Sequence, residues 1–68
     1  MTLLEMAAEA RLQAVQYRAW ADAKRAANQD PRSRYRWPDH DIEQKDKRAA
    51  MFDNMAKSLE ALASRRGS

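Results

Sequence analysis

The chain has 68 residues, of which 34% are charged, a formal net charge of +3, and no cysteine. A chain this short forms at most one small domain and buries a modest fraction of its surface. The lack of cysteine excludes a disulfide framework and a thiolate metal site, and a single histidine is too few for a histidine-rich metal site. Small domains usually need an additional source of stability, and oligomerisation is the one that remains.

The sequence contains no apolar run near the roughly 18 residues that a membrane span requires. Its N-terminus lacks the basic start and the continuous apolar core of a signal peptide, because Glu5 and Glu9 interrupt it. With neither cysteine nor a signal, we predict a cytoplasmic protein that does not act on membranes.

The first predicted helix spans residues 3–28. Thr2 and Glu5 have the spacing of a capping box, in which each side chain accepts a hydrogen bond from the other residue's main chain. At the other end, Asn28 tolerates the left-handed conformation that closes many helices, and Pro31 disfavours helix for the residue before it.

The apolar residues of this helix fall on two separate stripes when each residue turns by about 100°. One stripe contains Leu3, Met6, Ala7, Ala10, Ala14, Tyr17 and Ala21. The other contains Leu4, Ala8, Leu12, Val15, Ala19, Ala23 and Ala26. A two-helix chain covers only one stripe from within, and water is the least favourable cover for the second. The periodicity allows either stripe to face a second copy.

We therefore predict that the protein associates, and a homodimer is the simplest form of association. Residues of the second stripe are assigned to the contact between the two copies. The predicted dimer interface consists of Leu4, Ala8, Leu12, Val15 and Ala19.

The predicted connection, residues 29–38, contains a segment in which basic and large residues alternate: Arg32, Ser33, Arg34, Tyr35, Arg36 and Trp37, followed by Pro38. In an extended segment the arginines point to one side and the aromatic rings to the other. Arginine, tyrosine and tryptophan are the usual hot-spot residues of protein interfaces. Arginines beside aromatic rings also bind single-stranded nucleic acids. A third interpretation is that both rings fold back and plug the end of the hairpin.

The predicted partner-binding residues are Arg32, Arg34, Tyr35, Arg36, Trp37 and Trp20. Trp20 lies off both stripes, so it is either a border residue of the dimer or an exposed anchor for a partner. The net charge of +3 is concentrated near the connection, whereas a nucleic-acid-binding protein usually shows a broader basic stripe. We therefore predict a second protein as the partner and keep a nucleic acid as the alternative.

The second predicted helix spans residues 39–66 and begins near Asp39 or Asp41, since aspartate is a favourable N-capping residue. Gly67 is a natural stop just beyond its last turn. The helix has a single apolar stripe, which contains Ile42, Ala49, Phe52, Met55, Ala56, Leu59, Leu62 and Ala63. The residues of this stripe that we expect to be buried are Phe52, Met55, Leu59 and Leu62.

These elements predict an all-α fold with one domain, residues 1–68, arranged as an antiparallel two-helix hairpin. Two helices of similar length joined by a connection of about ten residues suit that arrangement. A twofold dimer would cover the second stripe of the first helix and complete a four-helix bundle.

No group of residues points to catalysis or to a cofactor. The stretch Asp39-His40-Asp41 combines residue types found in metal sites, but sequence neighbours on a helix do not converge on one point. Ser33 and Ser58 have no paired base, and the chain has no glycine-rich phosphate loop. We therefore predict a protein that is not an enzyme and that holds no metal and no cofactor.

The outline resembles two families of small regulators. A short helical hairpin that pairs into a four-helix bundle resembles the plasmid RNA-binding regulators of the repressor-of-primer type, although the long Arg-rich connection departs from that family's tight turn. The size, the lack of cysteine and the surplus apolar face in Leu4, Leu12 and Val15 resemble small phage-encoded host-takeover proteins of the quorum-sensing anti-activator type. The second resemblance implies a dimeric inhibitor that sequesters host proteins such as a transcriptional activator.

Overall fold

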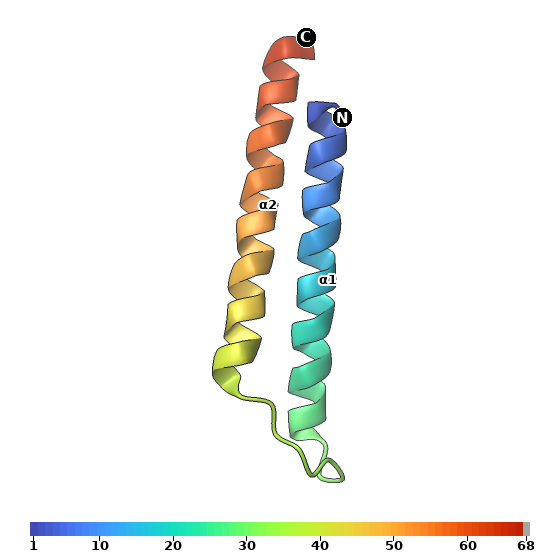
Figure 1. The fold of residues 1–68 in the computed structure, drawn as a ribbon, viewed down its shortest axis with the longest axis vertical. Coiled ribbons are helices and arrows are strands. Elements are labelled where there is room, and N and C mark those ends of the chain that lie inside the picture. Colours follow the sequence, from blue (N-terminus) through green and yellow to red (C-terminus); the bar gives the residue numbers. More distant parts are fainter. Residues whose placement is uncertain (68) are drawn as a thin grey trace.

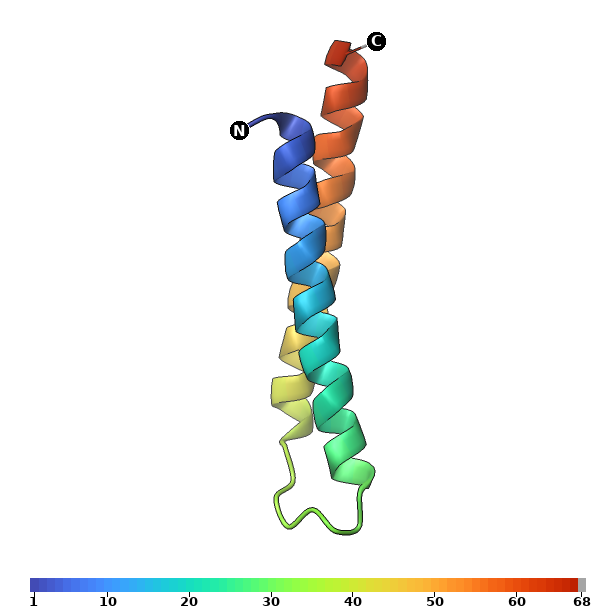
Figure 2. The same cartoon turned by 90° about the vertical axis from the view of Figure 1, so that its right-hand side faces the viewer.

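The computed structural model describes residues 1–67, which form two α-helices packed side by side in an antiparallel hairpin. Helix α1 spans Leu3–Gln29 and helix α2 spans Asp39–Gly67, with the connection joining them at one end of the rod (Figure 1). The rod extends over 54 × 16 × 15 Å. Seen from the side, the two helices cross at a shallow angle, and the chain begins and ends at the end opposite the connection (Figure 2). The prediction of an all-α two-helix hairpin is confirmed.

The start of α1 is held by the predicted capping box. The Glu5 N–H donates to Thr2 Oγ1 at 3.1 Å, and the Thr2 N–H donates to Glu5 Oε1 at 3.3 Å. These bonds satisfy two of the main-chain donors that every helix leaves free at its N-terminus.

The end of α1 differs from the prediction. No residue from 1 to 67 has a positive φ, so Asn28 does not close the helix in the left-handed conformation. The helix continues to Gln29, and Asp30 follows in an extended conformation with its N–H donating to the Ala27 carbonyl at 3.2 Å. The Asn28 side chain instead forms hydrogen bonds with the main chain of Trp37, as described below.

Helix α2 begins at Asp39, the earlier of the two predicted starts. The Pro38 carbonyl accepts from the N–H groups of Asp41 and Ile42 at 3.1 and 3.3 Å, so Asp41 lies inside the first turn. Its negative charge is favourable there because the N-terminus of a helix carries partial positive charge. At its other end α2 extends through Gly67, one residue beyond the predicted bound.

The two helices meet along a line of small side chains. The buried residues are Ala7, Ala10, Ala14, Ala21, Ile42, Ala49 and Ala56. We call this set the alanine seam. Three members on α1 and three on α2 repeat every seven residues, a spacing that keeps one line of side chains turned toward a partner helix. Helices with small side chains at the contact pack at the short end of the usual interaxial range.

The large side chains of α2 lie beside the seam, which corrects the prediction that Phe52, Met55, Leu59 and Leu62 are buried. Phe52 and Leu59 are half-buried, whereas Met55 and Leu62 are 45% and 43% exposed. Alanines occupy the positions between the helices, so larger side chains are displaced to the edges of the contact. There, Phe52 stacks on Tyr17 of α1 with ring centroids 5.7 Å apart.

Candidate functional site

One edge of the hairpin is a ladder of ion pairs. Arginines spaced by seven residues on α1 pair with carboxylates spaced by seven on α2, giving Arg11–Glu60, Arg18–Asp53 and Arg25–Asp46. The antiparallel register therefore places a carboxylate of α2 opposite each of these arginines. Exposed ion pairs contribute little stability individually, but a ladder in this register opposes sliding of one helix along the other. We call this edge the ion-pair ladder.

The strongest geometry in the ladder belongs to Arg11 and Glu60. Arg11 Nη2 donates to Glu60 Oε1 at 2.6 Å, and Arg11 Nε donates to Oε2 at 3.0 Å, which is a bidentate contact. Chiefly because of this hydrogen bonding, the pKa of Glu60 lies below the ordinary value of 4.5. The same bonding raises the pKa of Arg11.

This shift predicts a loss of stability in acid. A carboxyl group whose pKa is lowered by folding stabilises the fold above its unfolded pKa, and that contribution disappears as pH falls through the folded pKa. We expect Glu60→Gln to melt below the wild type at about pH 7 and to converge with it below about pH 4. Thermal unfolding by circular dichroism across that range checks this. A constant difference at every pH would contradict it.

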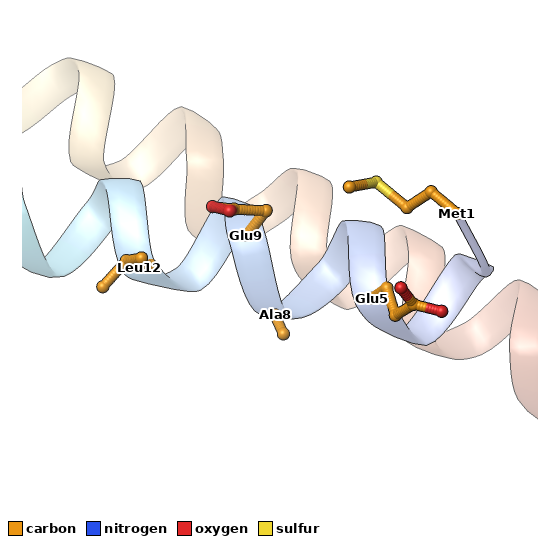
Figure 3. A pocket seen from close by; sticks show the side chains of 5 residues that line it. All are labelled: Met1, Glu5, Ala8, Glu9 and Leu12. Atoms are coloured by element: carbon orange, nitrogen blue, oxygen red, sulfur yellow. The ribbon is translucent and has the colours of Figure 1, made fainter.

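The outer face of α1 is apolar and uncovered. We define the outer face as Leu4, Ala8, Leu12, Val15 and Ala19, which are all exposed. The exposed fractions are 62% for Leu4, 49% for Leu12 and 61% for Val15. Figure 3 shows a shallow hollow on this side of the helix, lined by Met1, Glu5, Ala8, Glu9 and Leu12. No residue of α2 lines it. The structure thus gathers the residues of the predicted dimer interface on one open surface.

The connection is anchored to α1 through Trp37. The Trp37 N–H donates to Asn28 Oδ1 at 2.8 Å, and Asn28 Nδ2 donates to the Trp37 carbonyl at 2.9 Å. The Trp37 ring meets Trp20 edge to face with centroids 5.6 Å apart, and Lys24 Nζ lies 4.2 Å from the Trp37 ring centroid. Trp20 is therefore half-buried within its own chain. Trp20 is thus less exposed than a free-standing anchor, while its two predicted roles, at the border of the dimer or as an anchor for a partner, stay predictions.

The rest of the connection is exposed. Tyr35 packs edge to face on Trp37 with centroids 4.9 Å apart, yet most of its own side chain is open to solvent. Arg32, Arg34 and Arg36 are exposed, and none of them forms an ion pair with residues 1–67. The interpretation that both rings fold back onto the end of the hairpin therefore holds for Trp37 but not for Tyr35. Of the predicted partner-binding residues, the three arginines and Tyr35 are the accessible ones.

The structure also contains a groove that the sequence did not predict. Three hollows follow one another along the contact between α1 and α2. The first and second share the lining residue Gln13, and the second and third share Trp20 and Lys45. We call them together the groove. Toward the chain termini it is lined mainly by Met6, Ala10, Phe52, Met55 and Leu59. Toward the connection it is lined by Trp20, Trp37, Asp41, Gln44, Lys45 and Arg48.

The signal for the groove is present in the sequence but weak. Alanine at every seventh position implies that the neighbouring large residues, such as Phe52 and Leu59, flank the contact instead of filling it. Lys45 and Arg48 lie among many charged residues in the first turns of α2, which read as an ordinary solvated surface.

Comparison of the chain with known protein families, with curated proteins and with solved structures finds no match. Within residues 1–67, neither helix has an apolar stretch of the length needed to cross a bilayer. In the same part of the chain, no three His, Cys, Asp or Glu side chains are grouped so that they could hold a metal ion. Three features of the described residues bear on function: the outer face, the connection and the groove.

Proposed function

We propose that this protein is a non-enzymatic protein–protein interaction module, a small dimeric regulator or inhibitor that binds and sequesters another protein. The observation that carries the proposal is the outer face of α1, where Leu4, Leu12 and Val15 are about half or more exposed. Contiguous apolar surface of this kind marks association sites in soluble proteins. The buried core of the hairpin is almost entirely alanine, so a single copy has little apolar volume with which to stabilise itself.

In the proposed dimer, the outer faces of two α1 helices pack against each other and form the centre of a four-helix bundle. Ala8 and Val15 are seven residues apart, as are Leu12 and Ala19. This is the repeat that keeps side chains turned toward a partner helix in a bundle. The face combines the large side chains of Leu4, Leu12 and Val15 with the small ones of Ala8 and Ala19, a mixture that favours interdigitation across a twofold axis.

In this proposal the connection is the contact for the sequestered protein. Its three arginines have no carboxylate partner among residues 1–67 and lie beside the exposed ring of Tyr35. Arginine and tyrosine are enriched among the residues that dominate interface energies. A dimer carries the connection twice, and two linked contacts raise the overall affinity above that of either one.

The double variant Arg34→Ala/Arg36→Ala tests this role. We expect it to weaken binding of a partner recovered from the host cell by about tenfold or more, with helicity and dimerisation unchanged. Arg65→Ala/Arg66→Ala is the matched control, because it removes the same charge from the opposite end of the rod. Isothermal titration calorimetry gives the affinities and circular dichroism the helicity. Equal affinities for both double variants would move the binding site away from the connection.

The exposed, unpaired arginines beside Tyr35 also favour a second candidate function, that of a small nucleic-acid-binding regulator. Phosphate neutralisation and base stacking use the same residue types. Salt separates the two functions, because affinity for a nucleic acid falls steeply with salt concentration. A protein contact with an apolar centre depends on salt far less.

A further inference from the structure

The groove has two halves of different chemistry. In the half nearer the termini, half-buried Phe52 and Leu59 lie beside exposed Met6 and Met55. In the half nearer the connection, Trp20 and Trp37 lie beside the basic side chains of Lys45 and Arg48. A surface with an apolar half and a cationic aromatic half fits a ligand that is itself apolar at one end and acidic at the other.

The cations of the groove are positioned but unpaired. Lys45 Nζ lies 5.5 Å from the ring centroids of both Tyr17 and Trp20. Lys24 lies next to the groove, with its Nζ 5.4 Å from the ring centroid of Trp20. Lysine ammonium groups over ring faces are held by cation–π attraction and keep their N–H donors free. Within residues 1–67, neither lysine nor Arg48 forms an ion pair.

The ion-pair ladder, on the opposite edge of the hairpin, treats its cations differently from the groove. Each arginine of the ion-pair ladder has a carboxylate on the facing helix, whereas Lys45 and Arg48 in the groove have no ion-pair partner among residues 1–67. In the groove, the half nearer the connection contains one carboxylate, Asp41, beside Lys45 and Arg48. An acidic ligand would therefore find two cations there that are not already paired with a carboxylate.

We propose that the groove binds an amphipathic helix of the sequestered protein, with its apolar residues against Phe52, Met55 and Leu59 and its carboxylates against Lys45 and Arg48. This inference rests on the proposed function and names the chemistry of the partner. From Met6 to Trp20 the groove follows α1 for roughly 21 Å, the length of a helix of about 14 residues. Amphipathic helices commonly bind in apolar grooves of this kind, and complementary charge fixes their direction.

A nucleic acid fits the groove less well. Glu9 lines the half nearer the termini together with Met6 and Met55, so a polyanion running along the groove would meet a negative charge and an apolar surface. A peptide helix that is acidic at only one end avoids that repulsion and covers the methionines. The charge and polarity of the whole groove therefore favour the helix.

The two tryptophans of the chain, Trp20 and Trp37, both line the groove, so intrinsic fluorescence reports its occupancy. The probe is a synthetic amphipathic peptide of about 14 residues with an apolar stripe and glutamates at one end. A second peptide has lysines in place of those glutamates. We expect the glutamate peptide to change the fluorescence saturably and to bind at least about tenfold more tightly than the lysine peptide.

Charge reversal in the groove provides the matched variants. Lys45→Glu/Arg48→Glu is expected to lose at least about tenfold in affinity for the glutamate peptide. The control, Lys47→Glu/Lys57→Glu, makes the same change in net charge at exposed positions outside the groove and should bind as the wild type does. If circular dichroism shows that the reversed variant has lost helicity, Lys45→Gln/Arg48→Gln replaces it with the same expected direction of effect.

Three results would overturn the inference: equal affinity for both peptides, equal loss in the groove and control variants, or saturation of the fluorescence only by a single-stranded oligonucleotide. The proposed function is tested separately, by sedimentation of the wild type and by the Arg34→Ala/Arg36→Ala variant. A dimer whose connection binds a protein but whose groove ignores the glutamate peptide would contradict this inference alone. A monomer that binds the peptide would contradict the proposed dimer alone.

Discussion

Replacing Ala14 with leucine is expected to destabilise the hairpin by about 1–3 kcal/mol, which is a large part of the stability of a protein this small. The Ala14 side chain is completely buried in the alanine seam. A leucine there would push α1 away from α2, separating the pairs of the ion-pair ladder and the stacked rings of Tyr17 and Phe52. One substitution thus removes several contacts that depend on close approach of the helices.

The matched control is Ala50→Leu, the same substitution at an exposed alanine of α2. It should change stability by less than about 0.5 kcal/mol, because surface substitutions away from special features are usually that small. Urea unfolding followed by circular dichroism compares the two variants. If Ala14→Leu unfolds at the same urea concentration as Ala50→Leu, the helices do not meet at the alanine seam.

Replacing Leu12 with glutamate is expected to weaken the proposed dimer by about 100-fold or more. A twofold axis repeats every substitution, so each dimer would bury two carboxylates in the apolar centre of its interface. A loss of about 1.4 kcal/mol in binding free energy is tenfold in affinity, so that loss from each of the two copies gives about 100-fold. Sedimentation velocity of the variant over a range of concentrations gives the change in dimer affinity.

Asn54→Glu serves as the control for this experiment, because it adds one negative charge at an exposed position of α2 outside the outer face. We expect it to sediment as the wild type does. Dimerisation of Leu12→Glu with wild-type affinity would show that the outer face of α1 is not the contact between copies.

Much of the fold follows from local sequence rules. Thr2 and Glu5 predict the start of α1 because capping-box bonds form between residues three apart. The two stripes of α1 follow from its rotation per residue, and the structure buries Ala7 and Ala14 while it leaves Leu12 exposed. For the same reason, the sequence places the residues of the predicted dimer interface together on one face.

The packing of α2 did not follow from these rules. The size of a side chain and its position around the helix point to different residues as the buried ones. Ranking its stripe by apolar area selects Phe52 and Leu62, whereas the contact with α1 selects the smallest side chains, Ala49 and Ala56. With a rotation of 100° per residue, positions seven apart drift around the helix by about 20° each heptad. A wheel drawn with that rotation therefore does not place the alanines of the seam on one straight line.

Contacts between distant residues account for the remaining differences. The bonds from Asn28 to the Trp37 main chain and the edge-to-face contact of Trp37 with Trp20 join the connection to α1. No local rule predicts them, because they depend on the path that residues 30–38 take back to the helices. The groove depends on the same path, since Trp37 forms part of its lining.

The most direct test of the account is the mass of the wild-type protein in solution. The outer face of α1 has no cover within the chain, and the proposed function requires that a second copy supply it. Sedimentation equilibrium at micromolar concentration should give twice the chain mass of 7.9 kDa. A single species of 7.9 kDa throughout that range would contradict the proposed dimer and leave the outer face to a different protein.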